Sequence, residues 1–429
     1  MPHFGVFCPP VPGHVNPFCA LGRALVRRGN QVTFFHVEDL APAIKAENLG
    51  FVALHDEHFP PGALKDFTAK LASLQGLNSL RFAIEGACRV ARLILDCAPA
   101  AVRNAGIDAL LVDQNEPAGG TVAEHLGLPF VSICTSLPLN REAAIPPPFV
   151  GWNYGDSGFA RMRNWLGYTV SDRFIAPIQE NLNRYRTRWG LAPLKTPDDS
   201  FSRLAQIAQM PRDFDFPRKT LTPVFEYCGP WFDDFAPPVA FPFERLDGRP
   251  VIYGSLGTLQ PRDSHYFGLI AEACSGLDAQ LILSLGSKGG APPPGLPGDP
   301  IVVGYAPQIE LLSRAAVTIT HSGMNTTQQS LYFGVPLVAI PLTHDQPAIA
   351  ARLARTGAGI VIAKERLNSS VLRTAIRSVL SPGNSYRASA CRMREACRAA
   401  GGTERAVDIL ESVLPKGDDR KMPLIQPLS

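Results

Sequence analysis

Two stretches of this chain begin in the same way, with a short apolar run, a glycine-containing turn and then a helical pattern. The first run covers residues 4–8, with a helical pattern over 18–28, and the second covers residues 251–253, with a helical pattern over 264–274. Apolar runs without polar alternation, separated by helices, are typical of parallel sheets that helices cover on both faces. The sequence therefore predicts an α/β fold of two facing, doubly wound, Rossmann-like domains with a cleft between them.

Further apolar runs predict the remaining strands. They cover residues 31–36, 109–112, 130–133 and 204–208 in the first half, and 280–284, 301–303, 317–320, 337–340 and 359–362 in the second. The proline-rich segment 235–249 has neither a helical nor a strand period, which is typical of a linker. We therefore expect an N-terminal domain (1–234), this linker (235–249), a C-terminal domain (250–415) and a tail (416–429). A single long Rossmann-like domain with insertions is the alternative.

The charge balance and the cysteine pattern exclude several classes of protein. Lys and Arg number 41 against 38 Asp and Glu, so no bulk basic surface points to nucleic acid. No apolar run reaches the roughly 18 residues of a membrane span, and the first residues do not read as a secretory signal. The 9 cysteines contain no CxxC pair, which favours a reducing compartment and disfavours a metal site. We expect a cytoplasmic protein without metal or cofactor.

The segment around residue 320 predicts an anion-binding site. The apolar run 317–320 ends at His321, a glycine turn with Gly323 follows, and Asn325 or Thr326 is placed to cap the next helix. Free backbone N–H groups and the helix dipole then point at one place, where a phosphate can bind. His321 can add a hydrogen bond to that phosphate.

Other groups on both sides of this turn have the chemistry of a nucleotide-sugar site. Tyr305 offers a flat ring for a base, with Gln308 one turn further on, and Asp345 and Gln346 offer a carboxylate and an amide to sugar hydroxyls. Taken singly, each of these residues is as readily a helix cap or a structural residue. In this order and at these spacings they form a signature.

With these residues the chain resembles the UDP-dependent glycosyltransferases of the GT-B fold. The donor motif of that family runs from aromatic-x-Pro-Gln, through His-x-Gly-x-Asn-Ser/Thr and Gly-Val-Pro, to Asp/Glu-Gln. The resemblance implies a UDP-sugar in the C-terminal domain and an acceptor in the N-terminal domain. The donor residues that it implies are Tyr305 and Gln308 at the base, Gln329 at the ribose, Thr258, His321, Asn325 and Thr326 at the phosphates, Ser322 and Gly323 in the turn, and Asp345 and Gln346 at the sugar.

Two positions depart from the commonest form of the motif. Tyr305 stands where many members have Trp, and Gln329 stands where many have a Glu that holds both ribose hydroxyls. An amide binds a ribose hydroxyl less strongly than a carboxylate does. The choice between UDP and dTDP therefore stays open.

A histidine and an aspartate follow two predicted strands of the first half. His14 lies just past the first strand, in a Pro-Gly-His loop, and Asp113 ends another. Both side chains are expected in one crevice, where a histidine held by a carboxylate can act as a general base. A capping aspartate with a structural histidine is the alternative; Asp108 and Glu116 are rival carboxylates, although Asp108 precedes its strand and is expected at the wrong end. The family resemblance favours His14 as the catalytic base and Asp113 as its partner.

The resemblance implies an inverting transfer in which an acceptor hydroxyl gives its proton to His14 and attacks C1 of the sugar. The helix N-terminus after Gly323, with His321, stabilises the charge on the leaving diphosphate without a metal ion. Two other classes stay open: a UDP-sugar 2-epimerase and a nucleotide-sugar binder without catalysis. The presence of both His14 and Asp113 argues against the second.

The acceptor is predicted less sharply than the donor. The strings 113–119 and 137–142 resemble the carotenoid branch of the family, the zeaxanthin glucosyltransferases, which implies UDP-glucose and a hydrophobic acceptor such as a carotenoid. Polyketide, macrolide or flavonoid acceptors with UDP- or dTDP-sugars are the alternative. Segment 143–168 mixes proline, aromatic and arginine residues, which is typical of core packing or of an apolar lip in peripheral contact with the inner face of a membrane. The candidate acceptor residues are Asn16, Leu137, Phe149 and Trp152.

Overall fold

The computed structural model describes residues 1–55, 59–74, 76–233, 237–257, 264–286 and 292–414, which form two α/β halves. The strands of the first half are β1 (His3–Phe7), β2 (Gln31–His36), β3 (Gly50–Ala53), β4 (Ala109–Asp113), β5 (Phe130–Cys134), β6 (Gln206–Ala208) and β7 (Phe225–Tyr227). Those of the second half are β8 (Val251–Ser255), β9 (Gln280–Ser284), β10 (Ile301–Val303), β11 (Ala315–Thr320), β12 (Leu337–Ala339) and β13 (Gly359–Val361).

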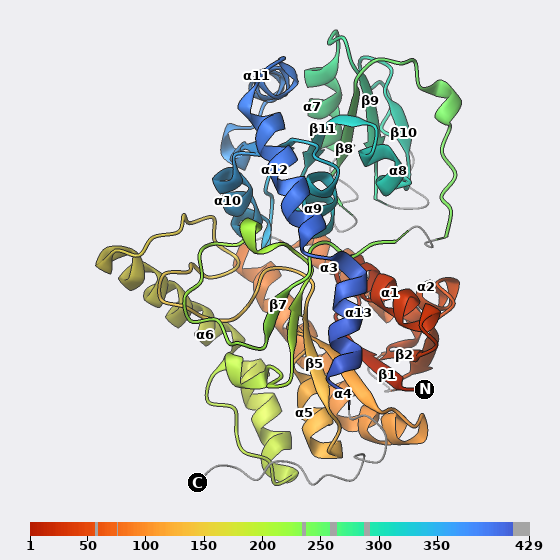
Figure 1. Cartoon of the computed structure of the whole chain (residues 1–429), viewed down its shortest axis with the longest axis vertical. Helices are drawn as coiled ribbons and strands as arrows, with labels where there is room; N and C mark the ends of the chain where they lie inside the picture. The colour runs from red at the N-terminus through yellow and green to blue at the C-terminus, as the bar shows by residue number, and fades with distance from the viewer. Residues whose placement is uncertain (56–58, 75, 234–236, 258–263, 287–291, 415–429) are drawn as a thin grey trace.

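Both sheets are parallel and doubly wound. The first has the order β3-β2-β1-β4-β5-β6-β7 and the second the order β10-β9-β8-β11-β12-β13, and every strand pair in the described parts of the chain is parallel. The predicted fold class is therefore confirmed. In Figure 1 the second half lies above the first, and the carboxyl ends of β1 and β4 lie at the same edge of the first sheet.

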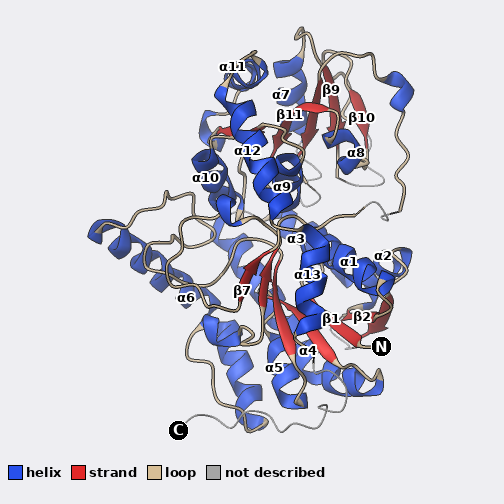
Figure 2. Cartoon of the chain, viewed as in Figure 1, coloured by secondary structure: helices blue, strands red, loops and turns tan. Residues whose placement is uncertain are grey.

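Helices cover both sheets, as Figure 2 shows. In the first half they are α1 (Pro12–Arg27), α2 (Ala41–Ala46), α3 (Ala63–Ser73), α4 (Gly76–Asn104), α5 (Ala118–Leu126) and α6 (Gly158–Arg188). The later helices are α7 (Ser264–Cys274), α8 (Gln308–Leu312), α9 (Met324–Tyr332), α10 (Gln346–Thr356), α11 (Ser369–Leu380), α12 (Ser385–Ala399) and α13 (Gly402–Ser412). In the described part of the chain, no helix is long and apolar enough to cross a membrane.

The predicted strands all occur in the structure, with ends that differ by up to two residues, but two edge strands were missed. Both β3 and β7 are short, and both lie at the outer edges of their sheet, where little apolar sequence is needed. The helix predicted over 18–28 was placed too late, because α1 begins at Pro12. Proline is tolerated in the first turn of a helix, so Pro12 starts the helix instead of delaying it. His14 consequently lies in the first turn of α1 and not in a loop.

The last helix returns to the first half of the chain. Helix α13 packs on α1, and Ala406, Val407 and Leu410 join the buried core around β1 and β2. Ion pairs from Arg28 to Glu404 and Asp408 add to this contact. The sequence analysis did not anticipate this return, and the domain borders at 234, 249 and 415 stay a prediction. Residues 234–236 and the tail 416–429 lie outside the described residues.

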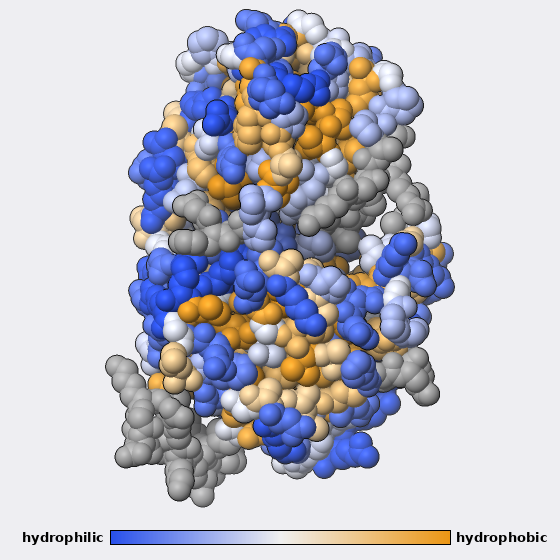
Figure 3. All heavy atoms as spheres, turned by 90° about the vertical axis from the view of Figure 1, so that its right-hand side faces the viewer, coloured by the Kyte–Doolittle hydropathy of each residue, from blue (hydrophilic) through white to orange (hydrophobic). Residues whose placement is uncertain are grey.

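The two halves share one apolar core. It joins Leu137, Met210 and Phe214 of the first half to Leu331 and other buried residues of α9, α10 and α12. On the face seen in Figure 3, where the halves lie one above the other, hydrophobic and hydrophilic residues are intermixed.

An ion network also joins the halves. Asp215 accepts from Arg352 of α10 at 2.7 Å and from Arg218 at 2.6 Å, and these side chains are 1–2% exposed. Tyr227 donates a further hydrogen bond to the same carboxylate. Because a lone buried charge is costly, this network fixes α10 against the first half.

Candidate active site

A histidine–carboxylate pair lies at the carboxyl edge of the first sheet. Strands β1 and β4 are neighbours with Phe7 opposite Val112, so the residue after each strand reaches the same edge. His14, in the first turn of α1, has its Nδ1 2.8 Å from Oδ2 of Asp113. The side chain of Asp113 is 0% exposed and that of His14 is 20% exposed. One ring nitrogen is therefore held by a buried carboxylate, while the residue remains open to the space between the halves.

Thr135, which the sequence analysis did not select, hydrogen-bonds to both members of this pair. Its Oγ1 lies 2.7 Å from Nδ1 of His14 and donates to Oδ2 of Asp113 at 2.6 Å. The other carboxylate oxygen accepts from the backbone and side-chain amides of Asn115, at 2.8 and 3.1 Å. This network places the proton of the neutral imidazole on Nδ1, which leaves Nε2 free to accept one. The only available signal was that Thr135 directly follows β5, the next strand along the same edge.

The same network shifts the pKa of both partners. Burial by itself lowers the pKa of His14, but the charge of Asp113 and the hydrogen bond to it, together with the charge of Asp345, raise that pKa above its ordinary value. Burial by itself raises the pKa of Asp113, but His14 and the hydrogen bonds from Thr135 and Asn115 lower it below its ordinary value. The carboxylate is therefore charged at neutral pH and the imidazole is a strengthened base.

The two rival carboxylates do not contact His14. Asp108 lies at the other end of the sheet, as expected, where it accepts from the backbone N–H of His3 at 2.8 Å. Glu116 is buried beside Asp113, and burial raises its pKa to about 8. A carboxyl group with that pKa is mostly neutral at pH 7, so it cannot supply the charge that supports a histidine base.

In the second half, the turn between β11 and α9 is built around the ring of His321. A Cβ placed on Gly257 or on Gly323 would lie 2.6 Å from that ring, so both positions require glycine. Ser322, between His321 and Gly323 in the chain, has φ +69°, a conformation that costs free energy and recurs at binding sites. Burial lowers the pKa of His321 to about 4, so the imidazole is neutral and can donate a hydrogen bond to an anion. Thr258, in the neighbouring loop, lies outside the described residues.

The cap of α9 differs from the prediction. The N-cap is Gly323, and neither Asn325 nor Thr326 provides a side-chain cap. The cause is visible in the contacts of Asn325: its amide donates to the carbonyl oxygen of Gly13 at 3.2 Å and accepts from Gln209 at 2.9 Å. That carbonyl is available because Pro17, four residues further along α1, has no N–H to donate to it. A proline inside the first helix thus leaves free an acceptor that the second half uses.

The groups expected at the base and ribose lie beside α8 and α9. Gln308 donates to Oε1 of Gln329 at 2.5 Å, and Oε1 of Gln308 accepts from the hydroxyls of Tyr253 and Thr326 at 3.1 and 3.3 Å. Tyr305, 37% exposed, hydrogen-bonds to the side chain of Asn16 in the first half. The structure therefore brings Gln308, Gln329 and Thr326 together and turns Asn16 toward the donor side.

Asp345 and Gln346 stand at the start of α10, in the same region as His14 and His321. The negative charge of Asp345 acts on the pKa of both histidines, and Ser136 of the first half donates a hydrogen bond to its carboxylate. Gln346 faces inward, since its Oε1 accepts from the backbone N–H groups of Leu342 and Thr343 at 2.8 and 2.9 Å. Asp345 thus lies close enough to both histidines for its charge to act on them, and Gln346 shapes the loop before it.

The candidate acceptor residues are not gathered in one place. Leu137 is 1% exposed and belongs to the core between the halves. Phe149 is 43% exposed, whereas Trp152 is partly buried beneath the guanidinium of Arg163, 5.0 Å from the ring centre.

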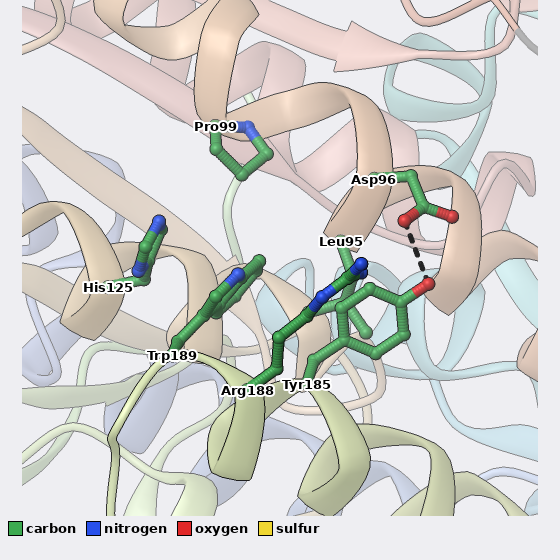
Figure 4. Close-up of a pocket in the computed structure, with 7 residues that line it drawn as sticks. All are labelled: Leu95, Asp96, Pro99, His125, Tyr185, Arg188 and Trp189. Atoms are coloured by element: carbon green, nitrogen blue, oxygen red, sulfur yellow. Dashed lines mark hydrogen bonds between the residues drawn. The ribbon is translucent and has the colours of Figure 1, made fainter.

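A cavity of about 200 Å³ lies away from these residues, between α4, the end of α5 and the end of α6. In Figure 4 the ring of His125 stacks on Trp189, with centroids 4.1 Å apart, and Tyr185 donates to Asp96 at 2.8 Å. None of the candidate residues lines it. In the described ranges, no group of three or more His, Cys, Asp and Glu side chains could hold a metal ion.

Comparisons with known proteins agree with this geometry. The model of the family described as UDP-glucoronosyl and UDP-glucosyl transferase matches residues 31–398. A zeaxanthin glucosyltransferase of Pantoea ananas is 35% identical over 421 residues, which cover 97% of each chain. One of Pseudescherichia vulneris is 32% identical and covers 96% of this chain and 98% of its own. The crystal structure of the glycotransferase of kitacinnamycin matches with a TM-score of 0.75 at 23% identity, over 97% of this chain and 100% of the other.

Proposed function

Because this chain belongs to the family of UDP-glucoronosyl and UDP-glucosyl transferases, an enzyme family of the GT-B fold, we propose that it glucosylates a hydrophobic alcohol. The donor in this proposal is UDP-glucose, and the acceptor is a long apolar molecule with a hydroxyl group, such as a carotenoid. The observation that carries the proposal is the 2.8 Å contact from His14 to the buried carboxylate of Asp113, next to Asp345 and His321 of the donor half.

The chemistry follows from the free nitrogen of His14. The acceptor hydroxyl donates to Nε2, its proton passes to the ring as its oxygen attacks C1 of glucose, and the bond from C1 to the diphosphate breaks. Attack from the face opposite the diphosphate inverts the anomeric centre. Asp113 stabilises the imidazolium that forms, and general-base catalysis of this kind contributes roughly 10²–10⁴-fold.

The leaving diphosphate is stabilised by the turn before α9. Backbone N–H groups at the start of this helix and the neutral ring of His321 are donors placed where negative charge grows. In this proposal Asn325 and Thr326 contact the phosphates, and Asp345 holds sugar hydroxyls. Gln346 supports Asp345 by ordering residues 342–346: its Oε1 accepts from two backbone N–H groups and its Nε2 donates to Thr343. We propose that the second N–H of this Nε2 contacts the sugar.

A hydrophobic acceptor is supported by the relatives and by the surface near the cleft. The two relatives described above are zeaxanthin glucosyltransferases. In this chain, Phe149 and the outer face of α6 expose apolar side chains beside the loop that reaches α10, where a Cβ on Gly151 would lie 3.3 Å from Pro347. We propose Phe149 and Trp152 as acceptor contacts. Macrolide, polyketide and flavonoid acceptors, and dTDP-sugars, are the competing assignment.

The test is a transfer assay with the purified protein. UDP-glucose and dTDP-glucose are each offered with zeaxanthin in micelles and with a water-soluble flavonoid, products are detected by mass spectrometry, and their anomeric configuration is read by NMR. We expect a β-glucoside of zeaxanthin from UDP-glucose; transfer only to the flavonoid, or only from dTDP-glucose, would support the competing assignment. Conversion of the donor alone, without acceptor, would indicate an epimerase.

A pair of variants links the activity to the proposed base. We expect His14→Ala to lower transfer by about 10²–10⁴-fold while UDP binding, measured by calorimetry, is kept. The matched control is His125→Ala, which removes a histidine from the distant cavity of Figure 4. Unchanged transfer in His14→Ala would exclude this histidine as the base.

A further inference from the structure

In the first turns of α6, apolar side chains face the solvent and polar side chains face the protein, the reverse of a normal surface helix. Helix α6 projects from the body of the protein, at the left of Figure 1. Its exposed side chains include Phe159, Met162, Trp165, Leu166 and Val170, which are 72, 53, 63, 50 and 59% exposed. Together these five residues are called the apolar ridge here.

The ridge is continuous because its members recur at helical spacing. Phe159, Met162, Leu166 and Val170 are three or four residues apart, so they lie on one face of α6, with Trp165 beside them. The opposite face contains Asn164, which is 0% exposed and donates to the carbonyl of residue 143 at 2.9 Å, and the buried Ser171. The helix thus buries polar groups and exposes apolar ones.

Exposure of this face to water is unfavourable, because five large apolar side chains within twelve residues form a contiguous apolar surface. A surface that covers a projecting apolar ridge must itself be apolar and deformable. The boundary between the headgroups and the acyl chains of a lipid bilayer meets both conditions.

The charges around the ridge favour an anionic lipid surface. Arg161 flanks the ridge on the side of Trp165 and is 53% exposed, and Lys219 is 65% exposed. Both side chains form ion pairs with the one carboxylate of Asp156, so the three groups together are positively charged. On the other side Arg163 lies over Trp152, and Arg173 is exposed one turn beyond Val170. Tryptophan beside arginine and lysine is the composition of segments that lie in the membrane interface.

A second copy of the chain fits this surface less well. A two-fold contact pairs each patch with itself. It would therefore bring Arg161 and Lys219 of one copy toward the same cations of the other.

We propose that the apolar ridge of α6 inserts into the interface of a membrane containing anionic lipids, with Arg161, Arg173 and Lys219 at the headgroups. The loop beside this ridge reaches the start of α10, so docking places the bilayer next to this helix, whose N-cap is Asp345. An apolar acceptor then reaches the proposed site directly from the lipid. The docking itself does not depend on which acceptor is used.

The test is co-sedimentation of the full chain with vesicles of phosphatidylcholine, with and without phosphatidylglycerol. We expect binding that is stronger with phosphatidylglycerol and that weakens with salt. The double variant Phe159→Ser/Trp165→Ser is expected to lower the partition coefficient by about tenfold or more on both vesicles, since each residue buries apolar area. The double variant Arg161→Gln/Lys219→Gln is expected to remove only the preference for phosphatidylglycerol.

The matched control replaces two apolar residues exposed elsewhere, Leu204→Ser and Val371→Ser, which are 44 and 40% exposed. All variants are checked for an unchanged thermal midpoint and unchanged UDP affinity. Absence of vesicle binding by the parent protein, or equal losses in ridge and control variants, would overturn the proposal. So would self-association in analytical ultracentrifugation that the ridge variant abolishes. Because no acceptor is used, this outcome is separate from failure of the proposed glucosyl transfer.

Discussion

The strongest prediction concerns the pH dependence of the proposed base. His14 must be unprotonated to accept a proton, so kcat/KM is expected to fall as the pH drops through the pKa of His14 in the free enzyme. The carboxylate of Asp113 raises that pKa above its ordinary value of 6.5. Replacement of Asp113 by Asn removes this charge, so the acidic limb of the profile is expected to move to lower pH while the maximum rate falls.

The attraction behind this shift follows from the 2.8 Å contact. Coulomb's law at that separation gives about 1.5 kcal/mol between unit charges in bulk water. Because Asp113 is fully buried, the screening is weaker, and the attraction that Asp113→Asn removes is larger than this bulk-water figure. The maximum rate is expected to fall by about 10²–10⁴-fold, because the imidazolium loses its stabilising charge and the ring its fixed tautomer.

The assay is kcat/KM for UDP-glucose from pH 5 to pH 9, with the acceptor at a fixed concentration well below its KM, so that the enzyme that binds the donor is free of acceptor. Asp108→Asn is the matched control, because Asp108 lies at the other end of the sheet and its contact to a backbone N–H survives the substitution. Its profile is expected to overlay that of the parent. A limb that stays in place, or moves to higher pH, in Asp113→Asn would refute the electrostatic account of the pair.

Other substitutions test single contacts. Thr135→Val removes the hydroxyl that contacts both His14 and Asp113, the proposed base and its partner. We expect a loss of about 10-fold in kcat with little change in KM for the donor; an unchanged kcat would limit Thr135 to packing. Gly323→Ala places a methyl group 2.6 Å from the ring of His321, so UDP affinity by calorimetry is expected to fall, whereas Gly268→Ala, which meets no neighbour, is the control. Asp215→Asn leaves the buried guanidinium groups of Arg218 and Arg352 without their negatively charged partner. The free energy of unfolding, measured with denaturant, is therefore expected to fall by about 3–5 kcal/mol.

The sequence predicted those parts of the fold that depend on local pattern. Strands such as β4 and β9 are buried along their whole length, and residues 109–112 and 281–283 form continuous apolar runs. The edge strands are harder to predict, because β7 has only three residues, one of them Glu226, and β3, although apolar, has only four. The predicted start of α1 at residue 18 is too late, because the helix begins at Pro12 and proline is compatible with the first turn of a helix.

The same distinction applies to the site. The neighbourhood of His14 and Asp113 could be expected, because both follow strands that end at one edge of a parallel sheet. Thr135 follows a third strand of that edge but is too common a residue there to stand out. The contact from Asn325 to the carbonyl of Gly13 could not be expected, because it depends on how the halves meet.

The way the halves meet has a consequence for the chemistry. Helix α10 is fixed to the first half by the buried pair of Arg352 and Asp215 and by the shared apolar core. At its start, Asp345 accepts a hydrogen bond from Ser136 of the first half, and its charge contributes to the raised pKa of His14. The same charge opposes the lowering of the pKa of His321, for which burial is the larger effect. Part of the basicity of His14 therefore comes from the donor half of the molecule. If His14 is the base, as proposed, its basicity is greatest when the halves are in contact, which in the proposed reaction is also the arrangement that brings the acceptor hydroxyl to the sugar carbon.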